Sequence, residues 1–214
     1  MKLKIEKDVL LNGIQTVQNV ITTKATLPIL ANILIETQQN SLRLTATDLD
    51  IGISCVIPVD IQEQGAITLP AKRFSDIIKE LPANVVSITT KKNNQVNIET
   101  EACQFKIMGL AREEFPKLPE FKDKEVLRRE QSLLRQVLSL TAFAVSADAT
   151  RYVLNGILFK INKNTLTLVA TDGKRLAIAE KKLNYVPEKE LSIIIPIKTV
   201  HELNRNLKEE GELS

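Results

Sequence analysis

The sequence has 214 residues, of which 43% are hydrophobic and 26% are charged, and this composition excludes a wholly disordered chain. No apolar stretch approaches the ~20 residues that cross a bilayer, and the N-terminal segment MKLKIEKDVL lacks the apolar core of a signal peptide. The two cysteines lie far apart, and together with the one histidine they match no metal-ligand spacing. From the distant cysteines and the lack of an apolar span or signal core, we expect a cytoplasmic protein with no membrane contact.

The net charge of +3 is unevenly distributed. Residues 1–120 hold 13 Lys and Arg against 14 Asp and Glu, whereas residues 121–214 hold 16 against 12. This is not the dense positive field of an autonomous nucleic-acid binder. Any contact with DNA must therefore come from the local placement of charge.

The first half of the chain alternates helical and strand patterns. After a short initial strand, residues 8–21 have the 3.6-residue period of an amphipathic helix. Period-two patterns then predict strands at 33–37 and 41–47, with QQN as the turn between them. A second helix is predicted over 71–81, just after a proline. Further strands are predicted at 85–91, 94–100 and 103–108.

The second half has the same order of elements. Residues 115–125, FPKLPEFKDKE, are predicted to be a linker. A helix over 131–145 follows, and another is predicted over 197–208. Between the two helices, strands at 157–161 and 165–171 flank the turn NKN.

These parallels arise from an internal repeat. Residues 27–48 align without a gap with residues 151–172, at an offset of 124, and residues 69–81 parallel 195–207. The sequence therefore predicts two copies of a domain of roughly 120 residues. We assign domain one to residues 1–120 and domain two to residues 121–214, and we expect the closing strands of domain two to lie outside this sequence.

Basic residues repeat with the fold. Lys72 and Lys79 lie two helical turns apart and so share a helix face, and their counterparts Lys198 and Arg205 have the same spacing. Solvated surface lysines are the simpler interpretation. A weakly positive surface that follows a phosphate backbone without base contacts is the functional interpretation.

Two loops carry further candidates at equivalent points of the repeat. Lys24 lies in TTKATLP, and Arg151 and Tyr152 follow SADAT. An exposed basic or aromatic residue at a loop tip can contact a phosphate or stack on a base. Partial burial of Tyr152 in the core is the alternative.

No pattern predicts catalysis or a cofactor. The dinucleotide fingerprint and the P-loop are both absent. Asp48, Asp50 and Asp172 raise the alternative of a metal-dependent hydrolase. However, Asp48 and Asp172 occupy the same repeat position at a strand end, where a carboxylate commonly caps a turn. Cys55, in ISCVI, is predicted to be a buried strand residue.

Seven stretches of the sequence form a specific set of motifs. They are TLPIL (26–30), LTATDLD (44–50), LPAKRFSDI (69–77), FPKL (115–118), RYVLNGILF (151–159), VATDGKRLA (169–177) and IPIKTVHEL (195–203). The combination of RYVLNGILF with VATDGKRLA is the most specific of them. Together these motifs resemble one family, the β sliding clamps of bacterial replicative DNA polymerases.

The resemblance implies an α+β DNA-clamp fold, with repeated domains that each pack two helices on antiparallel sheets. It implies a non-catalytic, cofactor-free processivity factor with three domains per chain. Two such chains join head to tail in a homodimer ring, which encircles duplex DNA without sequence preference. Short peptide motifs of the polymerase and of clamp-loader subunits bind to the ring.

The same resemblance assigns residues to three surfaces. DNA-binding residues are Lys24, Lys72, Lys79, Arg135, Arg151, Tyr152, Lys198 and Arg205. The partner-peptide pocket contains Leu154, Thr171, Gly173, Arg175 and Leu176. The dimer interface contains Phe105 and Ile107. For both pocket leucines, and for Phe105 and Ile107, burial in the core is the alternative.

The third domain of the family has no counterpart in this sequence. We therefore expect the 214-residue chain on its own to leave its Phe105 edge unpaired and not to close a ring. A stand-alone clamp-like module that binds peptides but does not encircle DNA is the alternative function.

Overall fold

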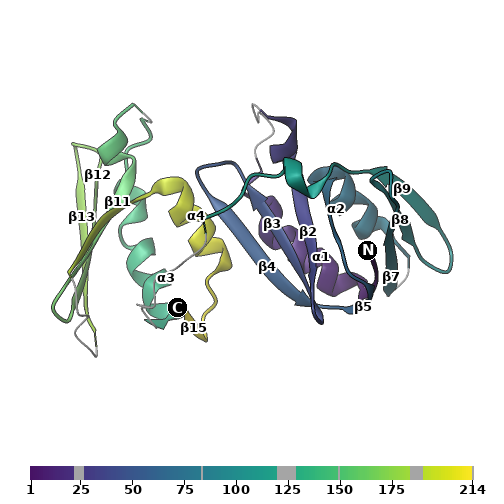
Figure 1. Ribbon diagram of the computed structural model, residues 1–214. Helices are drawn as coiled ribbons and strands as arrows, with labels where there is room; N and C mark the ends of the chain where they lie inside the picture. The colour runs from purple at the N-terminus through teal and green to yellow at the C-terminus, as the bar shows by residue number, and fades with distance from the viewer. Residues whose placement is uncertain (22–26, 83, 120–128, 149, 184–189, 214) are drawn as a thin grey trace. The chain divides into compact units, whose positions relative to one another are not determined.

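The computed structural model describes residues 1–21, 27–82, 84–119, 129–148, 150–183 and 190–213 (Figure 1). The chain divides into two compact units, Met1–Glu120 and Phe121–Ser214, called unit 1 and unit 2 below. No helix among the described residues is long and apolar enough to cross a membrane.

Unit 1 combines two helices with two antiparallel sheets. The helices are α1 (Lys7–Gln18) and α2 (Ala71–Glu80). One sheet has the order β4-β3-β2-β6, and the other has the order β5-β1-β7-β8-β9. The strands are β1 (Lys2–Glu6), β2 (Asn32–Gln38), β3 (Ser41–Thr47), β4 (Gly52–Pro58), β5 (Asp60–Glu63), β6 (Ala66–Pro70), β7 (Val85–Thr90), β8 (Gln95–Glu99) and β9 (Gln104–Met108).

The helices bury one apolar face each in a core shared with both sheets. Leu10 and Ile14 on α1, and Phe74 and Ile78 on α2, are fully buried. Leu44 of β3 belongs to the same core. The i, i+4 spacing of the helical residues explains why these segments form helices here, because it brings the apolar side chains to one side.

Unit 2 repeats the first of these sheets. Its strands are β11 (Gly156–Asn162), β12 (Thr165–Thr171), β13 (Leu176–Lys182) and β14 (Leu191–Pro196), in the order β13-β12-β11-β14. Helices α3 (Gln131–Ser139) and α4 (Ile197–Asn206) lie on one side of this sheet (Figure 1). Val137 and Val200 are fully buried between helices and sheet. A short pair, β10 (Arg129–Glu130) and β15 (Glu212–Leu213), is separate.

The repeat is visible in backbone detail. Gln39 and Lys163, at equivalent positions in the β2–β3 and β11–β12 turns, both have positive φ values of 43° and 52°. Strand β10 pairs with β15 as β1 pairs with β7. The first residue of the first helix in each unit also donates an equivalent backbone hydrogen bond, from Lys7 N–H to Asn84 O (2.8 Å) and from Gln131 N–H to Gly211 O (2.9 Å).

The predicted α+β class is confirmed, while several predicted boundaries are wrong. Helix α1 ends at Gln18 rather than at residue 21. Helix α3 ends at Ser139 rather than at residue 145. Just after this end, the buried Thr141 hydroxyl donates back to Val137 O (3.0 Å). A short 3-10 helix, η3 (Ala142–Ala144), follows. Phe115, the first residue of the predicted linker 115–125, is only 6% exposed, and residues 120–125 of that linker lie outside the described residues.

Candidate functional site

The turn after β3 is built again after β12, around the two predicted aspartates. Asp48 Oδ1 accepts hydrogen bonds from the backbone N–H groups two and three positions later (3.1 and 2.8 Å). Asp172 Oδ1 accepts the equivalent pair (2.9 and 3.0 Å). These backbone donors hold the pKa of Asp172 below its ordinary value. Turn capping by both carboxylates is therefore confirmed.

The metal-hydrolase alternative gains no support from this arrangement. Asp48 and Asp50 lie in unit 1, whereas Asp172 lies in unit 2. Within the described ranges, no three His, Cys, Asp or Glu residues are grouped closely enough to hold a metal ion.

The middle residue of each turn has a left-handed backbone. Gly173 has φ +88°, and its N–H donates to the Thr171 hydroxyl (3.1 Å). Leu49, its counterpart in unit 1, has φ +79° and is 58% exposed. A Cβ added at Gly173 would lie 3.6 Å from Arg151 Nη1, which is an ordinary contact. Glycine is therefore favoured at 173 by backbone conformation rather than by lack of space.

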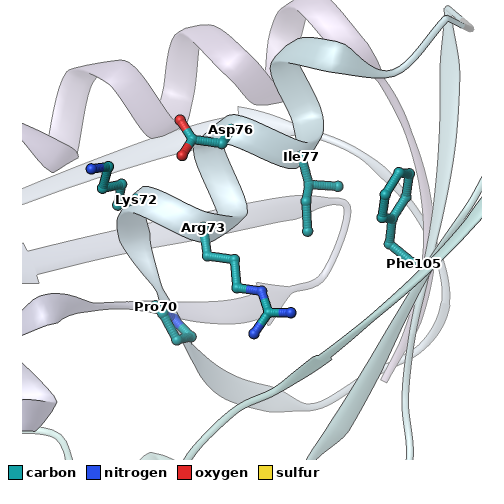
Figure 2. Close-up of a pocket in the computed structure, with 6 residues that line it drawn as sticks. All are labelled: Pro70, Lys72, Arg73, Asp76, Ile77 and Phe105. Carbon is teal, nitrogen blue, oxygen red and sulfur yellow. The ribbon is translucent and has the colours of Figure 1, made fainter.

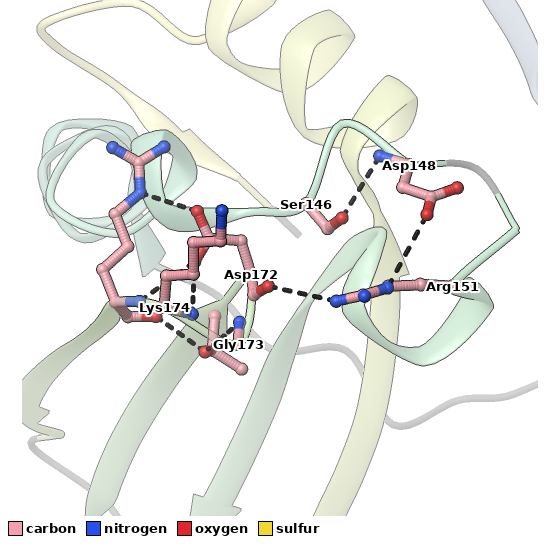
Figure 3. Close-up of polar contacts among 8 residues, drawn as sticks. Ser146, Asp148, Arg151, Asp172, Gly173 and Lys174 are labelled. Atoms are coloured by element: carbon pink, nitrogen blue, oxygen red, sulfur yellow. Dashed lines mark hydrogen bonds and ion pairs between the residues drawn. The ribbon is translucent and has the colours of Figure 1, made fainter.

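Arg151 connects the 146–154 loop to the Asp172 turn (Figure 3). Its guanidinium pairs with the Asp148 carboxylate (3.6 Å) and donates to the Asp172 backbone oxygen (3.4 Å). The Thr150 hydroxyl, more than Arg151, lowers the pKa of Asp148. The Arg151 side chain is 57% exposed, so it remains accessible to a ligand.

The predicted peptide-pocket residues lie on these two segments. Thr171, Gly173 and Arg175 form the turn, where the Thr171 hydroxyl donates to Arg175 O (2.6 Å). Leu176 begins β13 and is 61% exposed, so its burial in the core is the wrong interpretation. Leu154 is half-buried at the end of η4 (Tyr152–Leu154).

Two exposed apolar side chains near this site were not predicted. Phe143 is 61% exposed, and the Arg175 guanidinium carbon lies 5.7 Å from its ring centroid. Val153 is 65% exposed on η4. The sequence places Phe143 within a predicted helix, whereas in the structure it lies in η3, after the end of α3. Tyr152 is 82% exposed, so its partial burial is also the wrong interpretation.

The helical basic residues lie at the surface in both units. Lys72 and Lys79 on α2 are exposed, and Lys198 on α4 is half-buried. Arg205 is 60% exposed and pairs with Glu202 Oε1 (2.8 Å). Arg135 on α3 is 46% exposed and pairs with Glu209 (3.5 Å). Lys24 lies outside the described residues.

Glu202 is the residue of this surface that sequence reasoning missed. Its side chain is only 10% exposed, although it lies one helical turn from Arg205. The i, i+3 spacing of opposite charges was the available signal. The predicted basic surface therefore includes a carboxylate that neutralises one of its cations.

The two residues predicted for a dimer interface differ in exposure. Phe105 is 39% exposed on β9, an outer strand of its sheet, whereas Ile107 is 1% exposed and belongs to the unit 1 core. The Ile107 side chain is therefore unavailable to a partner, which corrects that part of the prediction.

Beside Phe105 lies an open pocket of about 480 Å³ (Figure 2). Apolar Ile77 and Phe105 form one side of it, and α2 adds charged groups of both signs. Its lining residues are Pro70, Lys72, Arg73, Asp76, Ile77 and Phe105.

Cys55 is half-buried on β4, not buried as predicted. This partial burial raises the pKa of its thiol. A raised pKa lowers the thiolate fraction and therefore argues against a nucleophile.

Comparison with known proteins matches both units to one family. Residues 1–119 match the DNA polymerase III beta subunit, N-terminal domain, and residues 129–214 match the central domain of the same subunit. The beta sliding clamp of Chlamydia muridarum is 34% identical over 210 residues, which cover 98% of this chain and 57% of the relative. That of Bacillus subtilis is 33% identical over 221 residues, covering 100% and 58%.

Solved structures give the same result. The crystal structure of the Bacillus subtilis sliding clamp matches with a TM-score of 0.96 at 32% identity, covering 99% of this chain and 58% of that one. A Pseudomonas aeruginosa clamp bound to griselimycin matches with a TM-score of 0.93 at 32% identity, with the same coverage. The chain thus spans less than two thirds of the length of these relatives.

Proposed function

The chain belongs to the DNA polymerase III beta subunit family, and on this premise we propose that the protein is a sliding clamp, the processivity factor of a replicative polymerase. It acts in the cytoplasm, without catalysis of its own, as part of a homodimer ring around duplex DNA. The observation that carries this proposal is the match of both units, in order, to consecutive domains of the family.

The repeated basic positions support a DNA-facing role for the helices. Lys72 and Lys79 recur as the basic residues Lys198 and Arg205 at equivalent helix positions of the second unit. Four long cations on helix surfaces attract phosphates without contacting base edges. Arg135 on α3, 46% exposed, adds a further cation in unit 2. A ring that slides needs this weak, sequence-independent attraction.

The loop residues extend the proposed DNA contact. Tyr152 is 82% exposed, which suits stacking or a contact with the backbone of DNA, and Arg151 is 57% exposed beside it. We assign Lys24 the same role in the first unit.

The proposed partner peptide binds beside the Asp172 turn. Leu176 and Leu154 supply apolar walls, and Arg175 supplies a polar rim, while Thr171 and Gly173 fix the turn that presents them. The ligand class is a short peptide with apolar anchors, carried by polymerase and clamp-loader subunits.

The dimer contact uses the β9 edge and the pocket beside it. Phe105 and Ile77 offer an apolar surface, and the neighbouring exposed Arg73 favours a partner with an acidic side chain. Main-chain groups of β9, rather than the buried Ile107 side chain, would pair with the partner strand.

The test is topological. The protein, prepared at the length of its relatives, is loaded with a clamp loader and ATP onto nicked circular DNA and filtered in high salt. We expect protein to stay on the circle and to leave after the DNA is linearised. Residues 1–214 alone serve as the control that should not be retained. Equal loss from circular and linear DNA would refute the clamp and leave a simple binding module.

A further inference from the structure

The outer face of the unit 2 sheet carries a straight row of aliphatic side chains. Pairing across the sheet aligns Ile178 with Val169, Val169 with Leu158, and Leu158 with Ile194. These four residues, called the outer row, alternate with core residues on every strand and so point away from α3 and α4. Ile178 is 58% exposed and Ile194 is 41% exposed.

The equivalent row of unit 1 differs in both chemistry and burial. It consists of Ser54, Thr45, Leu34 and Thr68, paired in the same register. Leu34, Thr45 and Thr68 are 8%, 4% and 0% exposed. The less apolar row is therefore the more deeply covered one, whereas the aliphatic row is exposed at Ile178 and Ile194 and half-buried at Leu158 and Val169.

Residues 109–118 cover the row in unit 1. Leu110 pairs with Thr68 of β6 through two backbone hydrogen bonds of 3.1 Å each. Two positions later, Arg112 forms an ion pair with Glu36 of β2 (2.8 Å). Further on, Leu118 lies against Gly52 of β4. The segment thus crosses from one side of the sheet to the other, along the path that follows β9 in Figure 1.

In unit 2, the groups that would receive such a segment are present. Because β14 pairs with β11 in the register that β6 has with β2, the N–H and C=O of Ile194 point outward, as those of Thr68 do. Ile193 is 44% exposed, whereas its counterpart Ile67 is 1% exposed beneath Gly109. No segment in the described part of unit 2 takes the place of 109–118.

The charge on this face is reversed between the units. The position of Glu36 in β2 is occupied in β11 by Lys160, which is exposed and lies beside the outer row. An arginine in the Arg112 position of a covering segment would be repelled there, while a carboxylate would be attracted. A segment that covers the unit 2 row would therefore need the opposite charge at this point.

We propose that the outer row binds an extended segment that follows unit 2 in a polypeptide of the relatives' length. The segment adds to the β14 edge at Ile194 and places a carboxylate against Lys160 two residues later. Polypeptides of that length have residues to supply such a segment, since the relatives match this chain over only 57–58% of their own residues. The proposal rests on the repeat and is independent of DNA binding.

The test uses two synthetic peptides in trans with the 214-residue chain. One has the sequence of residues 108–118, MGLAREEFPKL, and the other is the same peptide with Arg112→Asp. The isoleucine and leucine methyl groups of the chain are labelled for NMR. At millimolar concentration, the Asp peptide should shift the methyl signals of Ile178 and Ile194 and bind about fivefold more tightly than the Arg peptide.

Charge reversal on the chain should invert this preference. Lys160→Glu should bind the Arg peptide more tightly than the Asp peptide, whereas the control Lys163→Glu, in the adjacent turn, should keep the original order. Three results would overturn the proposal: no methyl shift at millimolar peptide, shifts with no inversion by Lys160→Glu, or shifts confined to Leu176. The last result would place the peptide at the proposed partner pocket instead.

Discussion

Replacement of Glu202 by glutamine should strengthen the binding of DNA. The Glu202 carboxylate holds Arg205 at 2.8 Å and is only 10% exposed, so it neutralises a cation of the proposed DNA-facing surface. Glu202→Gln keeps the size of the side chain but removes its charge. Arg205 can then pair with a phosphate without breaking an ion pair.

The magnitude follows from counterion release. One additional phosphate contact makes the slope of log K against log salt steeper by about 0.9, which at roughly 0.1 M salt corresponds to an increase in affinity of up to about eightfold. Fluorescence anisotropy with a labelled duplex, measured over a range of salt concentrations, gives both numbers. The increase should be the same for duplexes of different sequence.

A double-mutant cycle isolates the pair. In an Arg205→Ala background, Glu202→Gln should leave the affinity and the slope nearly unchanged. Glu63→Gln, which removes an exposed carboxylate from β5, is the matched control and should have little effect. If Glu202→Gln raises the affinity equally with and without Arg205, the increase reflects net charge alone and the pairing argument fails.

Three further predictions concern the two turns. Leu49→Gly should raise the free energy of unfolding by about 1 kcal/mol, and Gly173→Leu should lower it by about as much, because the positive φ at both sites strains any residue other than glycine. Urea denaturation measures each change, and a lower free energy of unfolding in Leu49→Gly would contradict the backbone strain at Leu49. Because the pKa of Asp172 is lowered in the folded state, its contribution to stability is complete above its unfolded pKa and is lost as the pH falls through the folded value. NMR titration of its carboxyl group measures this pKa, and Asp172→Asn is the control for stability. An ordinary pKa in the folded protein would contradict the prediction. Leu176→Asp should weaken a clamp-binding peptide at least tenfold in calorimetry without loss of fold, since Leu176 is 61% exposed, and unchanged binding would exclude it from the pocket.

The repeat in the sequence predicted much of the fold, because it is expressed in local turns and in helix periodicity. Asp48 and Asp172 were predicted as turn caps from their equivalent positions alone, and their hydrogen bonds match in detail. The end of α3 was not predictable in this way. The apolar period continues past Ser139, but the buried Thr141 hydroxyl bonds back to a helical carbonyl, and the chain turns into η3.

The sequence did not predict which apolar side chains on the strands are exposed. Phe105 and Ile107 share a face of β9, yet only Phe105 is accessible, because burial depends on how far the core extends under an outer strand. Leu176 and Ile178 are large aliphatic residues of the kind that fills protein cores, and both are nevertheless exposed. Alternation identifies the two faces of a strand but not which of them is covered, since the cover comes from segments distant in sequence.

The ion pairs of unit 2 bear on how a clamp of this kind could hold DNA. Arg135, Arg151 and Arg205, all proposed to contact DNA, each have an acidic partner in the absence of DNA. The exposed pairs of Arg135 and Arg151 contribute about 0–1 kcal/mol each, so a phosphate can replace either carboxylate with little change in free energy. Contacts of nearly balanced free energy are made and broken readily as the protein moves from one phosphate to the next. In a closed ring, retention would come from topology, and a stronger grip by these arginines would only slow the movement of the ring along DNA.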